Sequence, residues 1–218
     1  MAARRRLALS FDNGPDPAGT PFVLKELAAR NLTATFFPVG SQVSLPQGRE
    51  LLEEVAAAGH TIGNHSMTHT VPLGLSPGWE TVRREITDMR ELLGELAGEE
   101  KLFRPFGGGG HLGPHLFSKE AVEHLVAERY TVALWNSVPR DWEDPNGWPE
   151  RALADIRRRP WTLVVLHDVV VDAMKHLPAF LDRVLDDDVE ITTLLPEDCV
   201  PILRGRISGD LAPLVAQS

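Results

Sequence analysis

Residues 7–15 read LALSFDNGP, a short apolar run that ends in Asp12, Asn13 and a Gly-Pro turn. A short run of this kind, bounded by turn residues, is typical of a strand that is buried on both faces. The pattern returns along the chain and predicts seven such strands. They are Leu7–Phe11, Ala34–Val39, Thr61–Asn64, Leu102–Phe106, Thr131–Trp135, Leu163–Leu166 and Glu190–Leu194.

Segments with helical spacing of apolar residues separate these strands, and Ser118 has the position of an N-cap. The alternation of strands and helices indicates an α/β fold in which parallel strands are joined by crossover helices. We expect one domain over residues 1–218, built as a compact barrel of about seven strands, and a flat doubly wound sheet is the competing fold. The predicted helices are Pro21–Arg30, Arg49–Ala58, Thr81–Leu96, Lys119–Arg129, Glu150–Arg158 and Met174–Leu185.

The composition excludes several classes of protein. The chain has 218 residues, of which 43% are hydrophobic and 24% charged, so it is neither disordered nor fibrous. Its formal charge of −9 argues against nucleic acid or an anionic membrane as a partner. Cys199 is the single cysteine of the sequence, so no intramolecular disulfide is expected.

The start of the chain bears on its location. Residues 1–6 read MAARRR, and only the three apolar residues Leu7–Leu9 follow before Ser10. A secretory signal needs about 7–15 apolar residues at this point, and a membrane span needs about 18 or more. We therefore expect a cytoplasmic protein that does not associate with membranes.

Polar residues that are suited to catalysis follow several of the predicted strands. In parallel α/β folds the carboxyl ends of the strands converge on one face, so residues far apart in sequence meet there. Each of these residues alone also fits a turn, a cap or a structural ion pair, and only the whole set points to a site. The set is Asp12, Asn13, His65, His69, Arg104, Asp141, His167 and Asp168.

The motifs that contain these residues resemble, in order, those of the NodB-homology polysaccharide deacetylases, carbohydrate esterase family 4. The resemblance extends over nearly the whole chain, and several matched motifs in order are far more specific than any one of them. The matching segments are SFDNGP (10–15), ATFFPVG (34–40), GHTIGNHSMTH (59–69), FRP (103–105), DW (141–142) and VLHD (165–168).

The resemblance implies a distorted (β/α) barrel and a divalent metal held by His65, His69 and Asn13. Neutral imidazole nitrogens suit zinc best, with cobalt and nickel as alternatives. The family pattern makes Asp12 the general base, with Arg104 as its ion-pair partner, and His167 the general acid. It also implies that a main-chain N–H near Gly107 stabilises the oxyanion. The substrate-binding residues implied in the same way are Phe106, Gly107, Asp141 and Trp142.

Three positions depart from the family pattern and indicate a divergent member. Asn13 replaces an Asp, so the metal site is expected to bind more weakly. Val138 stands where the family has the first Asp of its Asp-x-x-Asp-Trp motif, so we expect His167 to lack its usual tether unless Asp141 or Asp168 replaces it. Gly107 replaces a larger residue and is expected to widen or loosen the pocket.

The leading hypothesis is a metal-dependent amide hydrolase that removes an N-acetyl or other acyl group from an amino sugar or a related small intracellular compound. An allantoinase-like hydrolase of cyclic amides is one alternative. A catalytically decayed sugar-binding protein is the other. The segment after Asp198 is expected to cover a barrel end or to form a dimer contact, so homo-oligomerisation stays open.

Overall fold

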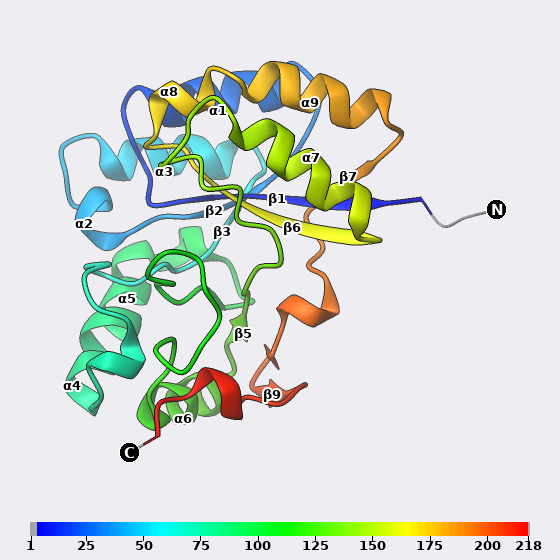
Figure 1. Cartoon of the computed structure of the whole chain (residues 1–218). Coiled ribbons are helices and arrows are strands. Elements are labelled where there is room, and N and C mark those ends of the chain that lie inside the picture. The colour runs from blue at the N-terminus through cyan, green and yellow to red at the C-terminus, as the bar shows by residue number, and fades with distance from the viewer. Residues whose placement is uncertain (1–3, 218) are drawn as a thin grey trace.

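Strand β1 (Arg6–Asp12) lies at the centre of the computed structural model, which describes residues 4–217 (Figure 1). It pairs in parallel along its whole length with β6 (Trp161–His167). On its other edge β1 pairs with β7 (Glu190–Thr192) at its amino half and with β2 (Thr35–Phe37) at its carboxyl half. All of β1 from Leu7 onward is buried, which explains the uninterrupted apolar run in the sequence.

The remaining parallel strands close the sheet into a distorted barrel. β2 pairs with β3 (Thr61–Ile62), and β4 (Leu102–Phe103) pairs with β5 (Thr131–Val132). Two single bridges join these halves, from Asn64 to Phe103 and from Ser137 to Val164. The circuit from β1 to β6 is therefore continuous. The predicted barrel is confirmed, and the alternative of an open doubly wound sheet is wrong because both edges of the larger sheet are joined to the smaller one.

Helices cover the barrel on its outside, and Figure 1 shows α1, α3, α7, α8 and α9 gathered over the larger sheet. The α-helices are α1 (Gly19–Ala28), α2 (Gly40–Val43), α3 (Gly48–Ala57), α4 (Trp79–Val82), α5 (Met89–Leu93), α6 (Lys119–Ala127), α7 (Trp148–Arg158), α8 (Val171–Met174) and α9 (Leu177–Asp186). Short 3-10 turns lie at Leu73–Leu75, Gly94–Ala97, Glu197–Cys199 and Ala212–Leu214. The predicted N-cap is confirmed, because the Ser118 hydroxyl accepts a hydrogen bond from the backbone N–H of Ala121.

The helix predicted over Thr81–Leu96 is not continuous. It consists of α4, a π-helical turn over Arg83–Asp88, α5 and a 3-10 turn. Within the π turn, the side-chain amide of Asn64 donates to the backbone carbonyl of Ile86 at 2.8 Å. A side chain that takes a helix carbonyl in this way interrupts the regular ladder, and such π turns are frequent near functional sites.

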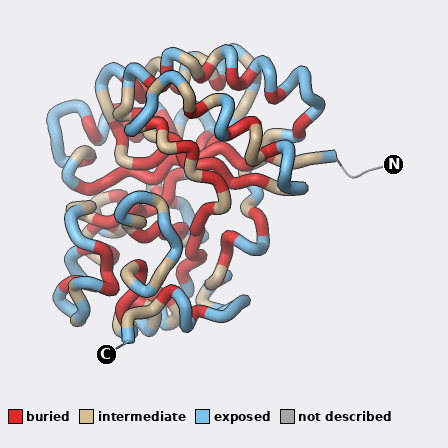
Figure 2. Tube along the Cα trace, in the orientation of Figure 1, coloured by how far each residue is buried: buried red, intermediate tan, exposed pale blue. Residues whose placement is uncertain are grey.

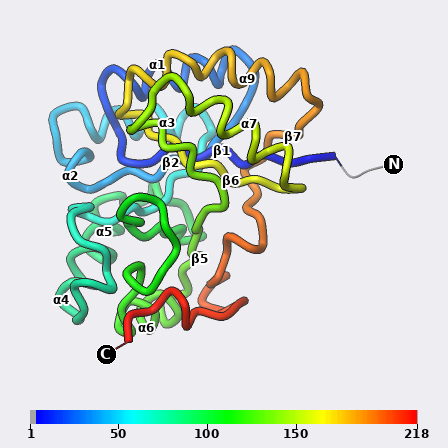
Figure 3. The backbone as a smooth tube through the Cα atoms, viewed as in Figure 1, coloured from blue at the N-terminus to red at the C-terminus, as the bar shows by residue number. Residues whose placement is uncertain are grey.

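The C-terminal segment adds structure that the sequence analysis did not predict. β8 (Ile202–Leu203) pairs antiparallel with β5 and with β9 (Arg206–Ile207). Figure 3 shows the end of the chain running past α6, where a bridge joins Phe117 to Val215. Strands of two residues give no periodic signal, which is why they were missed. Residues 1–3 belong to the segment on which the expectation about a secretory signal rests, and they lie outside the described residues.

The core lies between the strands and the surrounding helices, and Figure 2 shows the central strands β1, β2 and β6 as almost entirely buried. Phe11 and Phe36 stack there at 5.1 Å between ring centroids. Trp148 is fully buried, packs on Phe180 and donates its indole N–H to the carbonyl of Ala173 at 2.9 Å. Among residues 4–217, no helix is both long and apolar enough to cross a membrane.

Trp148→Phe should lower the free energy of unfolding by about 1–3 kcal/mol, because the buried Ala173 carbonyl loses its donor and a cavity forms. Trp79→Phe is the matched control, since Trp79 is 55% exposed, and it should change stability by less than about 0.5 kcal/mol. Urea denaturation of both variants measures the difference. Equal stabilities of the two variants would contradict this account of the core.

Candidate active site

A cavity of about 390 Å³ opens at the carboxyl ends of the strands. Asp12 ends β1 and His167 ends β6, and the two are paired neighbours in the sheet. The chain therefore brings two titratable groups to the cavity that are 155 residues apart in sequence, as expected for a parallel barrel. The lining consists of Asp12, Asn13, His65, His69, Pro105, Phe106, Gly107, Gly108, Gly109, Gly110, Trp135, Val138, Trp142, Val165, His167, Val169 and Val170.

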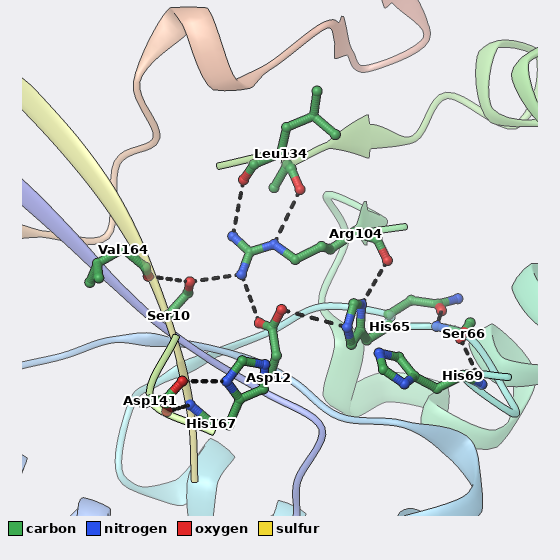
Figure 4. A network of polar contacts seen from close by, with 12 residues as sticks. Ser10, Asp12, His65, Ser66, His69, Arg104, Leu134, Asp141, Val164 and His167 are labelled. Atoms are coloured by element: carbon green, nitrogen blue, oxygen red, sulfur yellow. Dashed lines mark hydrogen bonds and ion pairs between the residues drawn. The ribbon is translucent and has the colours of Figure 1, made fainter. Parts of the chain in front are cut away.

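The base of the cavity contains a buried ion pair between Asp12 and Arg104 (Figure 4). Arg104 is fully buried, and its Nη1 donates to Oδ1 of Asp12 and to Oγ of Ser10, each at 2.7 Å. Nε and Nη2 donate to the carbonyls of Ala133 and Leu134 at 3.2 Å. The predicted pairing of Arg104 with a carboxylate is confirmed. The guanidinium fixes one oxygen of Asp12 and leaves Oδ2 facing His65.

His65 presents an unprotonated ring nitrogen to Asp12 and the cavity. Its Nδ1 lies 2.9 Å from the carbonyl oxygen of Arg104, and because a carbonyl only accepts, Nδ1 carries the proton. Nε2 lies 3.5 Å from Oδ2 of Asp12. Burial lowers the pKa of His65 to about 3. The ring is therefore neutral at pH 7, in the tautomer that metal-binding histidines use.

His69 lies next to His65, with 4.7 Å between the ring centroids. Burial, together with the neighbouring His65, lowers the pKa of His69 to about 3 as well. The ring of Phe106 packs against His69, with 3.9 Å between the ring centroids. Two neutral imidazoles thus lie together at the wall of the cavity.

The loop that carries both histidines is held by polar contacts that the sequence analysis missed. Ser66 and His69 have positive φ angles of 71° and 53°, conformations that need support in residues other than glycine. The Ser66 hydroxyl accepts the N–H of His69, and the buried carboxylate of Glu85 accepts both the N–H and the hydroxyl of Thr68. An acidic residue three positions after Val82, on the apolar face of the predicted helix, was the available signal.

Asn13 supplies a third group that fits a cation. Its side-chain oxygen is buried and has no hydrogen-bond partner among residues 4–217. A buried acceptor without a donor is costly unless a ligand satisfies it. No group of three or more His, Cys, Asp or Glu side chains in the described part of the chain is placed to hold a metal. The donor set that fits one is instead the amide oxygen of Asn13 with His65 and His69, a mixture that suits zinc and related ions.

His167 is tethered by Asp141, one of the two replacements that the sequence left open. Nδ1 of His167 donates to Oδ1 of Asp141, and the backbone N–H of His167 donates to Oδ2, both at 2.8 Å. Asp141 is fully buried, and both of its oxygens accept hydrogen bonds from His167. The expectation that it binds substrate is therefore wrong, and its role is to position His167. Val138 therefore does not leave His167 without a partner.

Asp168, the other suggested tether, points elsewhere. Its Oδ2 accepts a hydrogen bond from the Thr20 hydroxyl, and its Oδ1 has no partner in the described chain. Burial raises the pKa of Asp168 to about 7. For His167 burial alone lowers the pKa, but the hydrogen bond and charge of Asp141, together with the charges of Asp12 and Asp168, outweigh burial, so that its pKa is raised above the ordinary value.

The three remaining residues that were predicted to bind substrate, Phe106, Gly107 and Trp142, all line the cavity, and the prediction that Gly107 widens it is wrong. Phe106 and Trp142 are both in the wall, and the Trp142 ring meets His167 edge-on at 4.9 Å. Gly107 does not widen the pocket, because a Cβ there would lie 2.6 Å from the ring of Trp135. The indole of Trp135, which the sequence analysis did not single out, fills that space.

The comparison with known proteins agrees with this geometry. The sequence profile of the family described as polysaccharide deacetylase matches residues 2–123. The chain belongs to the polysaccharide deacetylase family. Polysaccharide deacetylases are hydrolases of carbon–nitrogen bonds, and they depend on a metal in general.

Two curated polysaccharide deacetylases illustrate the similarity. A peptidoglycan-N-acetylglucosamine deacetylase of Bacillus cereus is 36% identical over 141 residues, which are 64% of this chain and 61% of that protein. A chitooligosaccharide deacetylase of Rhizobium leguminosarum bv. phaseoli is 32% identical over 76% of this chain and 69% of that protein. The chain thus matches less than two thirds of the length of the Bacillus protein.

Solved structures of deacetylases share the fold. The peptidoglycan deacetylase PdaC from Bacillus subtilis is 26% identical, with a TM-score of 0.68 over 86% of this chain and 87% of that chain. The catalytic domain of a peptidoglycan N-acetylglucosamine deacetylase from Eubacterium rectale has a TM-score of 0.75 over 96% of each chain. That protein is 17% identical, so it shows the shared fold alone.

Asp141→Asn should lower the pKa of His167, because burial is then opposed only by the charges of Asp12 and Asp168. Because the pKa of His167 is raised in the folded protein, its ion pair with Asp141 stabilises the fold fully at pH values below the pKa that this histidine has in the unfolded chain. This contribution is lost as the pH rises through the pKa of His167 in the folded protein. The stability difference between the protein and Asp141→Asn should therefore narrow at higher pH. NMR titration of metal-free protein and denaturation at several pH values measure both effects.

Asp144→Asn provides a matched control for this experiment. Asp144 follows Asp141 in the same loop but is ion-paired with Arg151 at the surface. The control should leave the pKa of His167 unchanged. An unchanged His167 pKa in Asp141→Asn itself would contradict the tether.

Proposed function

We propose that this chain is a metal-dependent deacetylase that hydrolyses the amide bond of an N-acetylated amino sugar. The observation that carries the proposal is the meeting of three prepared groups at one cavity. These are Asp12 with its guanidinium partner, the neutral pair His65 and His69, and His167 with its carboxylate tether. The curated relatives, whose names describe deacetylases of peptidoglycan and chitooligosaccharide, support an amino sugar as the substrate class.

The proposed metal ligands are Asn13, His65 and His69. A zinc ion, or cobalt or nickel, bound there supplies Lewis acidity towards an amide carbonyl and lowers the pKa of a water molecule. The unpartnered amide oxygen of Asn13 and the neutral state of both rings support this assignment. An amide ligand adds no negative charge, so the affinity for metal is expected to be lower than with a carboxylate.

The chain's own residues carry the proton transfers. Oδ2 of Asp12, which Arg104 leaves free, takes a proton from the attacking water while the water oxygen bonds to the carbonyl carbon. As the carbon–nitrogen bond breaks, Nε2 of His167 gives its proton to the departing amine. The Asp141 carboxylate on Nδ1 favours the protonated ring that this step needs. Acetate and a free amine are the products.

The substrate is proposed to be a small N-acylated amino sugar or oligosaccharide, and residues 1–218 are proposed to act as one catalytic domain. Gly107 is proposed to place a main-chain N–H near the developing oxyanion. Cytoplasmic action stays a prediction from the sequence.

The alternative of a catalytically decayed protein depended partly on Val138, and the contact of Asp141 with His167 removes that part of its basis.

Protein stripped with a chelator and reloaded with zinc or cobalt should release acetate from N-acetylglucosamine oligomers, and the stripped protein should not. Asp12→Asn should lower kcat/KM by about 10²–10⁴, because it removes the base while preserving the shape of the side chain. His176→Ala is the control, since His176 bonds Asn146 outside the cavity. A reloaded protein that releases no acetate from any N-acetylated sugar would refute the proposal.

Asn13→Asp should bind zinc about tenfold or more tightly, since a carboxylate adds a negative ligand charge. Competition with a chromogenic chelator measures the affinity without any turnover. Asn31→Asp adds the same charge at an exposed position near the opposite end of β2 and should leave the affinity unchanged. Equal affinity in Asn13→Asp and the parent protein would show that residue 13 is not a ligand.

A further inference from the structure

The side chains around the cavity divide sharply into two kinds. Five of them are polar, and all five belong to the site already described, namely Asp12, Asn13, His65, His69 and His167. Every other described lining residue is apolar or glycine. Apart from the indole N–H of Trp142, the cavity therefore offers no further side-chain donor or acceptor to a substrate.

Two carbonyls of the glycine-rich segment of the wall, Gly107–Gly110, are engaged within the protein. The carbonyl of Gly107 accepts a hydrogen bond from His115 at 3.0 Å, and the carbonyl of Gly110 accepts one from the indole of Trp135 at 2.8 Å. A Cβ on Gly110 would lie 2.7 Å from Val138, as one on Gly107 would meet Trp135. Gly107 and Gly110 thus pack closely against these two side chains, while Gly108 and Gly109 are exposed.

Two side chains of the lining, Trp135 and Val165, lie deep in the cavity, and Val138 is half-buried beside them. Val165 precedes His167 by two residues on β6, so its side chain is on the same face of the strand, one step further from the strand's carboxyl end. Val165 is 5% exposed and Trp135 is 6% exposed, whereas Trp142 and Val169 are half-buried. The interior of the cavity is thus apolar where Val165 and Trp135 line it, beside the ion pair of Asp12 and Arg104 at the base.

An N-acylated sugar has two ends, and they differ in what they need. The hydroxyl groups of the sugar lose hydrogen bonds if they enter a region without polar partners, which is costly. The acyl group is terminal and apolar beyond its carbonyl. With the carbonyl beside Asp12 and the nitrogen beside His167, the sugar is directed to the mouth and the acyl chain to the wall.

We propose that the wall formed by Trp135, Val138 and Val165 binds an N-acyl chain longer than acetyl, so that the preferred substrate is an amino sugar with a short fatty acyl group. The inference rests on the proposed function of the same site. A volume of about 390 Å³ is within the range of cavities that enclose a whole small ligand. Burial of each added methylene should raise binding about fourfold.

The decisive experiment compares glucosamine that is N-acylated with acetyl, propionyl or butyryl groups. For the zinc-loaded protein, kcat/KM should rise about fourfold per methylene, or about 15-fold from acetyl to butyryl. The highest kcat/KM with the acetyl compound would overturn the inference and leave the proposed function standing.

A binding measurement separates the inference from turnover. Asp12→Asn lacks the base, so calorimetry can follow the affinity for the three compounds without hydrolysis. An affinity of Asp12→Asn that increases with chain length supports the acyl wall, whether or not the zinc-loaded parent protein hydrolyses the compounds. A parent protein that hydrolyses none of them would instead refute the proposed function. Affinity that stays flat or decreases overturns the acyl wall.

Filling the wall tests which residues are responsible. Val138→Phe should lower the ratio of butyryl to acetyl kcat/KM by about tenfold, because the larger ring occupies the space of the chain. Val169→Phe fills the same cavity from the segment that follows β6 and serves as a second variant. Val171→Phe makes the same change at a 39% exposed residue outside the lining and should leave the ratio unchanged. An unchanged ratio in both lining variants would overturn the assignment.

Discussion

The buried guanidinium of Arg104 connects the two sheets of the barrel to the candidate catalytic carboxylate. Arg104 directly follows β4. Its guanidinium donates hydrogen bonds to the backbone after β5 and to the side chains of Ser10 and Asp12 on β1. The backbone carbonyl of Arg104 accepts a hydrogen bond from the ring N–H of His65. Removing one partner of a buried ion pair typically costs 3–5 kcal/mol, so this residue ties the chemistry of the site to the integrity of the fold.

The site prepares each of its groups through a contact made by the atom that does not face the cavity. Arg104 occupies one oxygen of Asp12 and leaves the other free, and a backbone carbonyl does the same for His65. Asp141 occupies one nitrogen of His167. Burial then makes the two sets of histidines behave oppositely. The pKa of His65 falls because desolvation exceeds the opposing effect of its hydrogen bond to the Arg104 carbonyl, while the pKa of His167 rises because Asp141 and the charges of nearby carboxylates oppose desolvation.

Local patterns in the sequence predicted the seven barrel strands and most of the helices, because burial and periodicity are visible one segment at a time. The same patterns failed where a distant residue decides the local state, as Asn64 does for the π turn after α4. Motif order predicted which residues meet at the cavity. It did not reveal that Asp141 tethers His167 or that Trp135 fills the space beside Gly107, since both depend on side-chain directions across the barrel.

Asp12 and His167 occupy paired positions on adjacent parallel strands, and this placement has a consequence for how the protein tolerates change. The spacing of the two backbones is set by the ladder at about 4.8 Å and does not depend on any loop. Insertions or exchanges in the surrounding loops can therefore reshape the cavity while the backbone spacing between the proposed base and the proposed acid stays unchanged. A slip of β6 by a single residue would turn His167 to the opposite face and end the chemistry at once.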